Sequence, residues 1–204
     1  MGKIFCIMGK SSTGKDSIYR HILCNASLDL KRLIPYTTRP IRVGETDGVE
    51  YVFVNDERLI QLQKEEKIIE LREYMTIAGI WRYFTVNDGQ IDLDHYNYLL
   101  IGTLESFLML KQHFGAEIVI PIYIEVEDGD RLARALKREK KQAIPGYEEM
   151  CRRFLADQAD FSEERLKAAG ITRRFQNADI QDVVQEITVF IEESVCDDFQ
   201  TTWE

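Results

Sequence analysis

The chain has 204 residues, of which 45% are hydrophobic and 30% charged, which is typical of a globular protein with one large domain or a core with insertions. The formal net charge is −9, so the chain as a whole does not attract nucleic acid or an anionic membrane, and we expect neither as a partner. The four cysteines lack paired spacing and no apolar run is long enough for a signal peptide or a membrane span, which predicts a cytoplasmic protein with free thiols.

A glycine-rich loop joins the first predicted strand, residues 4–8, to the first predicted helix, residues 17–23. The joining segment, Gly-Lys-Ser-Ser-Thr-Gly-Lys-Asp at 9–16, is typical of a P-loop. In a P-loop the backbone N–H groups and the helix dipole hold phosphates, and the lysine reaches the β- and γ-phosphates of a nucleoside triphosphate. The residues predicted to bind the triphosphate are Gly9, Ser11, Ser12, Thr13, Gly14, Lys15, Asp16 and Ser17.

Asp16 departs from the usual P-loop, in which Ser or Thr follows Gly-Lys and its hydroxyl binds Mg²⁺. A carboxylate is a good oxygen ligand for Mg²⁺, so we predict that Asp16 binds the metal. Two simpler explanations stay open. Asp16 could cap the first turn of the helix, where acidic residues are favoured, and the whole segment could be a chance glycine turn.

Residues 35–90 predict a small, strand-rich insertion. Its first part is a rigid polar segment in which Arg39 and Arg42 lie three apart; arginine suits bidentate phosphate recognition, and an exposed loop with solvated arginines explains the composition equally well. The elements expected after it are a strand at 48–54, a helix at 56–67, a short apolar segment around Glu70 at 68–71, and one or two strands at 77–86.

The rest of the chain returns to alternating strands and helices, which predicts a parallel sheet. The expected elements are strands at 98–101, 117–126 and 171–175, and helices at 104–114, 130–141, 148–154, 164–169 and 180–195. Pro121 argues against ladder pairing at its position. In the basic helix at 130–141, Arg131, Arg134, Arg138 and Lys141 share a face, while Leu132 and Leu136 mark the core side. This basic face predicts either phosphate contact or a solvated surface.

Residues 37–45, Thr-Thr-Arg-Pro-Ile-Arg-Val-Gly-Glu, followed by Gly48 and Tyr51, resemble the phosphate-binding motif of the guanylate kinase family of nucleoside monophosphate kinases. The resemblance extends from residue 3 to about residue 193. It implies that Arg39, Arg42 and Tyr51 hold the phosphate of GMP, with Glu45 in support.

The resemblance implies further site residues. Glu70 lies where the family's carboxylate accepts protons from the guanine edge, and Tyr83 and Thr85 match the family's Tyr-Gly-Thr/Ser element. Arg134, Arg138 and Arg153 match the family's lid arginines, which would act with Lys15 and Mg²⁺ on the transferred phosphoryl group. Asn177 falls where family members approach the adenine of ATP.

The fold implied by the resemblance is α/β: a P-loop kinase core with a parallel sheet flanked by helices, a strand-rich monophosphate-binding insertion and a helical lid. We expect the core at residues 1–34, 96–130 and 155–196, the insertion at 35–95, the lid at 131–154 and a tail at 197–204.

Three features depart from the family's pattern: Asp16, Phe84 in place of a glycine, and the segment 102–105, Gly-Thr-Leu-Glu, where the family carries an Asp that helps read guanine. The sequence therefore predicts an ATP-dependent, magnesium-dependent kinase that acts on a nucleoside monophosphate, with GMP as the expected acceptor and the oligomeric state open. Two alternatives are a ribose 1,5-bisphosphate kinase, since that related group shares the Gly-Lys-Asp-Ser ending, and a non-catalytic guanylate-kinase-like module that binds proteins.

Overall fold

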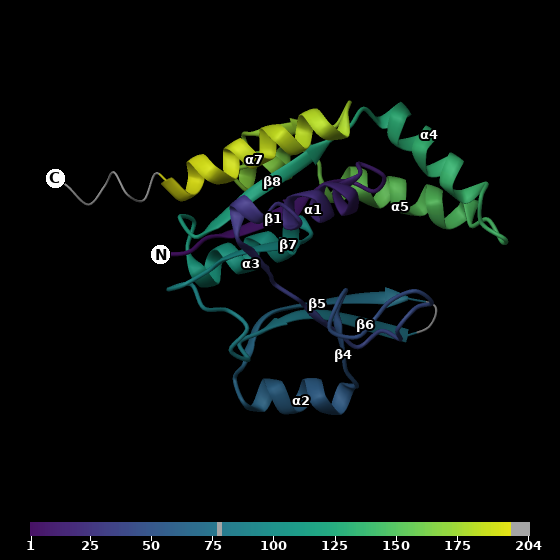
Figure 1. Ribbon diagram of the computed structural model, residues 1–204. Helices are drawn as coiled ribbons and strands as arrows, with labels where there is room; N and C mark the ends of the chain where they lie inside the picture. Colours follow the sequence, from purple (N-terminus) through teal and green to yellow (C-terminus); the bar gives the residue numbers. More distant parts are fainter. Residues whose placement is uncertain (77–78, 197–204) are drawn as a thin grey trace.

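A five-stranded parallel sheet carries the glycine-rich loop (Figure 1). The computed structural model describes residues 1–76 and 79–196. The strand order is β2-β7-β1-β8-β9, and the strands are β1 (Ile4–Met8), β2 (Leu30–Arg32), β7 (Asn97–Ile101), β8 (Val119–Glu125) and β9 (Arg174–Gln176). Every residue of β1 is buried, as its apolar run predicts for a central strand covered on both faces.

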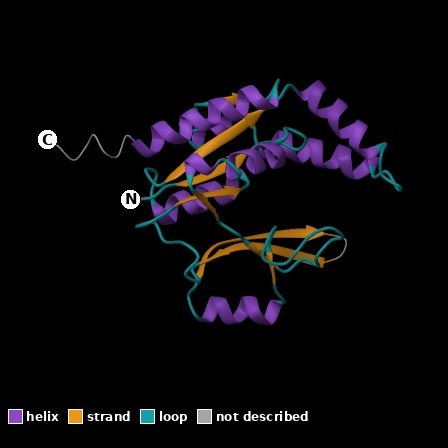
Figure 2. Cartoon of the chain, in the orientation of Figure 1, coloured by secondary structure: helices purple, strands orange, loops and turns teal. Residues whose placement is uncertain are grey.

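Helices cover both faces of this sheet (Figure 2). The side chains of β1 alternate, so Phe5 and Ile7 pack against α1 (Lys15–Leu23) and α7 (Ile180–Cys196). On the other face, Cys6 packs in the cluster formed with α3 (Leu104–Phe114) and α6 (Glu163–Ala168). The predicted α/β class, a parallel sheet flanked by helices, is confirmed.

A second, four-stranded sheet lies beside the core, in the order β4-β3-β6-β5. Its strands are β3 (Tyr36–Thr37), β4 (Val52–Phe53), β5 (Ile68–Thr76) and β6 (Gly79–Val86). The amphipathic helix α2 (Asp56–Lys64) covers one face, where Leu59 and Leu62 pack against Phe84 and Val86. Figure 1 shows that the opposite face looks toward the core. We call this uncovered face the groove face.

Two helices extend the core at the end where the glycine-rich loop lies (Figure 1). They are α4 (Asp128–Glu139) and α5 (Tyr147–Asp160), and a short 3₁₀ segment, η1 (Ala26–Leu28), follows α1. α5 is one continuous helix across residues 154 and 155, where the sequence placed a boundary between lid and core. Among the helices of residues 1–76 and 79–196, none is both long and apolar enough to cross a membrane.

Several predicted elements differ from those observed. The strand expected at 48–54 is reduced to β4 (Val52–Phe53), because the chain turns at Gly48, whose φ is 77°. Helix α2 ends at Lys64, and Glu66 follows with a φ of 55°. Pro121 does lie in the β1–β8 ladder, opposite Cys6. Pairing of β8 with β9 starts only at Tyr123, so Pro121 has a strand neighbour on one side, a position where proline is tolerated.

The orientation predicted for the basic helix is wrong. Leu132 and Leu136 are 37% and 38% exposed, while Arg131 is 1% exposed. The helix turns this way because hydrogen bonds from Arg131 to the glycine-rich loop and to α5 replace the expected leucine packing. The first two residues of the strands expected at 77–86 and the tail expected at 197–204 lie outside the described residues.

Candidate functional site: a glycine-rich loop facing basic side chains

The glycine-rich loop is held in a conformation that only small residues fit. A Cβ on Gly9 would lie 2.6 Å from the Ile124 carbonyl oxygen. Gly14, the N-terminal cap of α1, has a φ of 87°, and a Cβ there would lie 2.5 Å from the Asn177 side-chain nitrogen. That amide donates to the Thr13 carbonyl at 2.7 Å. The loop therefore delivers the chain to the N-terminus of α1, where the helix dipole favours an anion.

Ser12 is the least conventional residue of the loop. Its φ of 65° is in the left-handed region, which a non-glycine residue occupies at a cost in energy. Its hydroxyl is buried and has no hydrogen-bond partner among the described residues. Ser12 also lines the cavity described below. A strained residue that lines a cavity and whose hydroxyl has no hydrogen-bond partner among the described residues is suited to donating a hydrogen bond to a phosphate oxygen.

Lys15 begins α1 directly after Gly14. Burial lowers the pKa of its ammonium below the usual value, and the carboxylates of Asp16 and Asp157 oppose this shift, while Arg153 and Arg138 add to it. Lys15 thus lies in a desolvated environment that contains charges of both signs, where the negative charge of a polyphosphate would stabilise its ammonium. The Asp16 side chain is in the exposed first turn of α1, which fits both a metal ligand and a helix-capping residue.

A buried network fixes the glycine-rich loop to α4 and α5. Arg131 donates from Nε to the Ser11 carbonyl at 3.0 Å and from Nη2 to Asp157 Oδ2 at 2.9 Å. The same Asp157 oxygen accepts from the Ser11 backbone N–H at 2.7 Å, and Asp128 pairs with the other guanidinium nitrogen. The guanidinium also lies over the Phe154 ring, 4.9 Å from its centroid. Arg131 is therefore a buried structural residue and does not belong to a solvated basic face.

Asp157 was not identified from the sequence, because its contacts with Ser11 and Arg131 join residues that are far apart along the chain.

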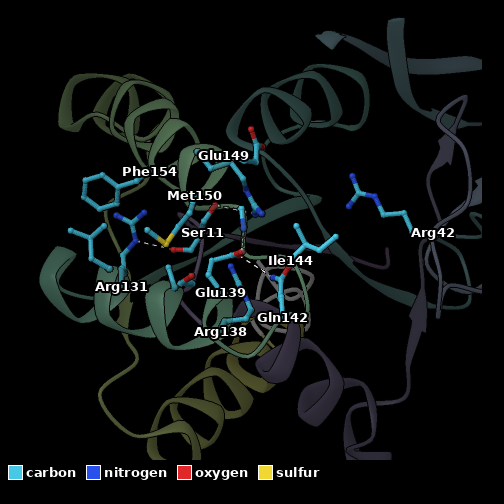
Figure 3. A pocket seen from close by; sticks show the side chains of 15 residues that line it. Ser11, Arg42, Arg131, Arg138, Glu139, Gln142, Ile144, Glu149, Met150 and Phe154 are labelled. Atoms are coloured by element: carbon cyan, nitrogen blue, oxygen red, sulfur yellow. Dashed lines mark hydrogen bonds between the residues drawn. The ribbon is translucent and has the colours of Figure 1, made fainter. Parts of the chain in front are cut away.

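A cavity of about 290 Å³ opens between the loop and the two helices (Figure 3). Its lining includes residues from three parts of the chain, namely Ser11, Ser12, Arg138, Glu149, Arg153 and Arg42. Figure 3 shows Arg42 lying across the cavity from the helices. Arg153 donates to the Ser11 hydroxyl at 3.3 Å. The structure thus brings Ser11, Ser12, Arg138, Arg153 and Arg42 to one cavity.

Arg134 and Asn177 contact each other at the side of the loop. Arg134 Nη2 donates to the Asn177 carbonyl at 3.0 Å, and the buried Asn177 amide supports Thr13 as described above. Both contacts shape the loop. The predicted approach of Asn177 to adenine stays a prediction.

The two arginines of the polar segment are in different environments. Arg39 is 4% exposed and forms a two-point ion pair with Glu45, at 2.7 Å from Nη1 and 2.5 Å from Nη2. These hydrogen bonds hold the pKa of the Glu45 carboxyl at about 2. The Glu45 carboxylate also accepts from the Arg42 backbone N–H at 2.8 Å. The Arg42 side chain is exposed, with its guanidinium 5.7 Å from the Trp81 ring centroid. The Arg42 side chain is therefore accessible, while Arg39 and Glu45 hold the segment that carries it.

Tyrosines line the groove face next to these arginines. Tyr51 and Tyr83 stack edge to face with centroids 5.5 Å apart, and Tyr83 stacks in the same way on Tyr74 at 5.6 Å. The Arg39 guanidinium lies 5.1 Å from the Tyr51 ring centroid. Burial raises the pKa of Tyr51, so its hydroxyl stays protonated and can donate a hydrogen bond.

Phe84, which stands where the family carries a glycine, does not lie on the groove face, because side chains alternate along β6. In an antiparallel pair, opposite residues share a face, and Tyr83 is opposite Arg72 while Thr85 is opposite Glu70. Phe84 lies between them, points to the other face and is fully buried against α2. Tyr83 and Thr85 are therefore on the groove face, together with Arg72 and Glu70.

Glu70 lies at the end of the groove face nearest α3. A bulge between Ile68 and Glu70 sets the register that places Glu70 opposite Thr85, whose hydroxyl donates to Glu70 Oε1 at 2.8 Å. Arg72 donates to both Glu70 oxygens, at 2.8 Å and 3.1 Å, and to the Thr103 hydroxyl at 3.3 Å. The sequence analysis missed Arg72, because a lone arginine in a strand carries no spacing signal.

The sequence and the fold of this chain are similar to those of known guanylate kinases. The family model for guanylate kinase matches residues 1–78. The chain is 27% identical over 183 residues to guanylate kinase of Malacoplasma penetrans, which covers 86% of this chain and 81% of the relative. It is 39% identical over 136 residues to guanylate kinase of Neisseria gonorrhoeae, covering 67% of this chain and 64% of the relative.

A match to guanylate kinase of Syntrophomonas wolfei, at 30% identity, spans 61% of that relative's length and 60% of this chain. The crystal structure of guanylate kinase from Anaplasma phagocytophilum has the same fold, with a TM-score of 0.61 at 20% identity over 94% of this chain and 85% of that chain. Over these segments the chain is similar in sequence to guanylate kinases, and it shares the fold of the solved guanylate kinase.

Proposed function

We propose that this chain is a nucleoside monophosphate kinase that transfers the γ-phosphoryl group of ATP to GMP, giving ADP and GDP. The observation that carries the proposal is the single cavity lined by Ser11 and Ser12 of the glycine-rich loop, by Arg138 and Arg153, and by Arg42. Phosphoryl transfer between two nucleotides needs cationic groups around donor and acceptor at once, and this cavity provides them. The curated relatives, all named guanylate kinase, favour GMP over the two alternative functions.

The chemistry needs no dedicated base in this chain. A phosphate monoester is largely dianionic at neutral pH, so the attacking oxygen already carries charge. We propose that Arg42 and Tyr51, held in place by Arg39 and Glu45, bind the acceptor phosphate. Positioning of donor and acceptor in line then supplies most of the rate enhancement.

On the donor side, we propose that the loop N–H groups and the Ser12 hydroxyl bind the phosphates of ATP, while Lys15 contacts the β- and γ-phosphates. Arg138 and Arg153 line the same cavity as the loop residues Ser11 and Ser12, where they would neutralise charge on the transferred group. Arg134 acts indirectly, through its hydrogen bond to Asn177.

A magnesium ion fits the chemistry of this site. Mg²⁺ prefers oxygen ligands and binds through one or two carboxylates together with substrate phosphates, and Asp16 offers an exposed carboxylate one residue after Lys15. When bound, the ion would offset the negative charge of the β- and γ-phosphates. The proposal also assigns monophosphate binding to residues 35–95 and the role of a lid to residues 131–154.

A coupled assay of ADP release tests the proposal. The acceptors are GMP, dGMP, AMP, CMP, UMP and ribose 1,5-bisphosphate, each with ATP and Mg²⁺, and Lys15→Ala serves as the inactive control. We expect the fastest ADP release with GMP and almost none in the control. Fastest release with ribose 1,5-bisphosphate, or no acceptor-dependent release at all, would contradict the proposal.

A further inference from the structure

Arg72 is a buried cation on the groove face that the proposed phosphate chemistry does not use. Its side chain is 9% exposed, and its partner Glu70 is 1% exposed. Arg72 lies opposite Tyr83 on the neighbouring strand, so both side chains project from the face that looks toward the core. Arg72 also donates to the Thr103 hydroxyl at the start of α3.

The hydrogen bonds of the Glu70 carboxylate are nearly saturated. A carboxylate has about four acceptor positions. Oε1 accepts from Arg72 Nη2 and from the Thr85 hydroxyl, and Oε2 accepts from Arg72 Nε. Among the described residues, this leaves one acceptor position on Oε2. Glu70 can therefore accept one further hydrogen bond without losing a present one.

The Arg72 guanidinium has the complementary capacity. Of its five N–H groups, two donate to Glu70 and one to Thr103, and a hydrogen bond to Tyr74 accounts for a fourth. Within residues 1–76 and 79–196 one N–H is left for an acceptor. The pair thus offers a ligand one charged donor and one charged acceptor, side by side.

A purine with a carbonyl at position 6 matches this arrangement, because its O6 accepts while the adjacent N1–H donates. Arginine is also the side chain that most often reads the O6 edge of guanine in nucleic acid complexes. Adenine presents the reverse order, a donor at position 6 and an acceptor at N1. With the phosphate held by Arg42 and Tyr51, as proposed above, the base cannot turn over to correct this mismatch.

We propose that Arg72 is a specificity-determining residue that donates a hydrogen bond to O6 of the acceptor base, so that the site selects 6-oxopurine monophosphates, GMP and IMP alike, against AMP. The inference rests on the proposed nucleoside monophosphate acceptor. The 2-amino group of guanine, which IMP lacks, contributes little because Glu70 has one acceptor position left.

Equilibrium binding tests the inference without requiring turnover. Calorimetry would measure binding of GMP, IMP, AMP and 6-thio-GMP to the full chain and to Arg72→Met. The 6-thio analogue keeps N1–H and the 2-amino group and replaces only O6 by sulfur, a weak acceptor. For the parent we expect GMP and IMP to bind within about tenfold of each other, and AMP and 6-thio-GMP to bind about 10- to 100-fold more weakly.

In Arg72→Met the preference for GMP over 6-thio-GMP should fall to within about threefold, a loss of about one hydrogen bond to a charged group. The preference for GMP over AMP should fall as well but should not vanish, because Glu70 still accepts from N1–H of GMP. Arg72→Met leaves the Glu70 carboxylate buried without its cation, which could destabilise the fold. The double variant Glu70→Gln/Arg72→Met removes both charges and is therefore measured as well, in case the single variant does not fold. Arg82→Met is the matched control, since Arg82 is on the same sheet but pairs with Glu73 and Asp56. It should leave every preference unchanged.

The outcomes separate the two proposals. Unchanged preferences in both Arg72 variants, IMP bound far more weakly than GMP by the parent, or no purine monophosphate bound at all would overturn the role of Arg72. Preferences that depend on Arg72 without any ADP release would support that role and would contradict only the proposed kinase activity.

Discussion

The network around Arg131 should be a principal anchor of the glycine-rich loop, and Asp157→Ala tests this. Arg131 is 1% exposed, and the substitution removes its 2.9 Å ion pair and the acceptor of the Ser11 N–H. Removing one partner of a buried ion pair costs about 3–5 kcal/mol, and because Arg131 keeps Asp128 we expect about 3 kcal/mol. At about 2–4 °C per kcal/mol for a chain of this size, Tm should fall by about 6–12 °C.

Scanning calorimetry measures this fall, and Asp160→Asn on the same helix is the matched control. The Asp160 carboxylate is 63% exposed and pairs with Arg165 at 3.2 Å, so its substitution should change Tm by less than about 2 °C. Arg131→Met should lower Tm about as much as Asp157→Ala, and the double variant should lower it little further because the two residues form one unit. Equal Tm values for Asp157→Ala and Asp160→Asn, or additive losses in the double variant, would refute the reasoning.

Four further predictions concern the proposed site. Lys15→Ala should lower kcat by about 10²–10³, and activity within a few-fold of the parent would remove Lys15 from the mechanism. Arg42→Lys should raise the KM of the acceptor far more than that of ATP, because lysine lacks the bidentate fork; equal effects on both would make Arg42 a surface residue. Asp16→Thr should narrow the difference between ATP and MgATP affinity in calorimetric titrations, whereas a slightly lower Tm with an unchanged difference would identify a capping role. The pKa of Glu45 is lowered from 4.5 to about 2, so its ion pair stabilises the fold above pH 4.5 and this contribution is lost as pH falls toward 2. Tm of Glu45→Gln should therefore depend less on pH across that window, and an unchanged dependence would contradict the ion pair.

Local sequence patterns predicted correctly those elements whose structure depends mainly on neighbouring residues. The strand at 4–8 and the helix at 104–114 have the predicted bounds, because periodicity and capping residues determine them. The glycine-rich loop was identified for the same reason: two glycines and a lysine at fixed spacing carry the signal. The roles of these loop residues in binding ATP stay predictions.

Long-range contacts were beyond sequence reasoning. Periodicity placed Arg131 on a basic face with its neighbours, yet its orientation depends on Ser11, 120 residues earlier, and on Asp157. Arg72 gave no signal at all, since its importance arises from a partner two residues away and from Thr103 on another element. The prediction of a strand at 48–54 was wrong over most of its length, because the chain turns at Gly48 despite the apolar alternation of the sequence.

Because α5 is one continuous helix, its two ends must move together as a rigid body. Its last turns carry Asp157 and Gln158, which are hydrogen-bonded to the loop residues Ser11 and Lys10, while its first turn lies ten residues away at Tyr147. At 1.5 Å per residue this arm is about 15 Å long, so a rotation of about 20° around the anchored end displaces the other end by about 5 Å. A rotation imposed on the anchored end would therefore be larger at the tip, and Arg153, partway along the arm, would move by a fraction of that distance.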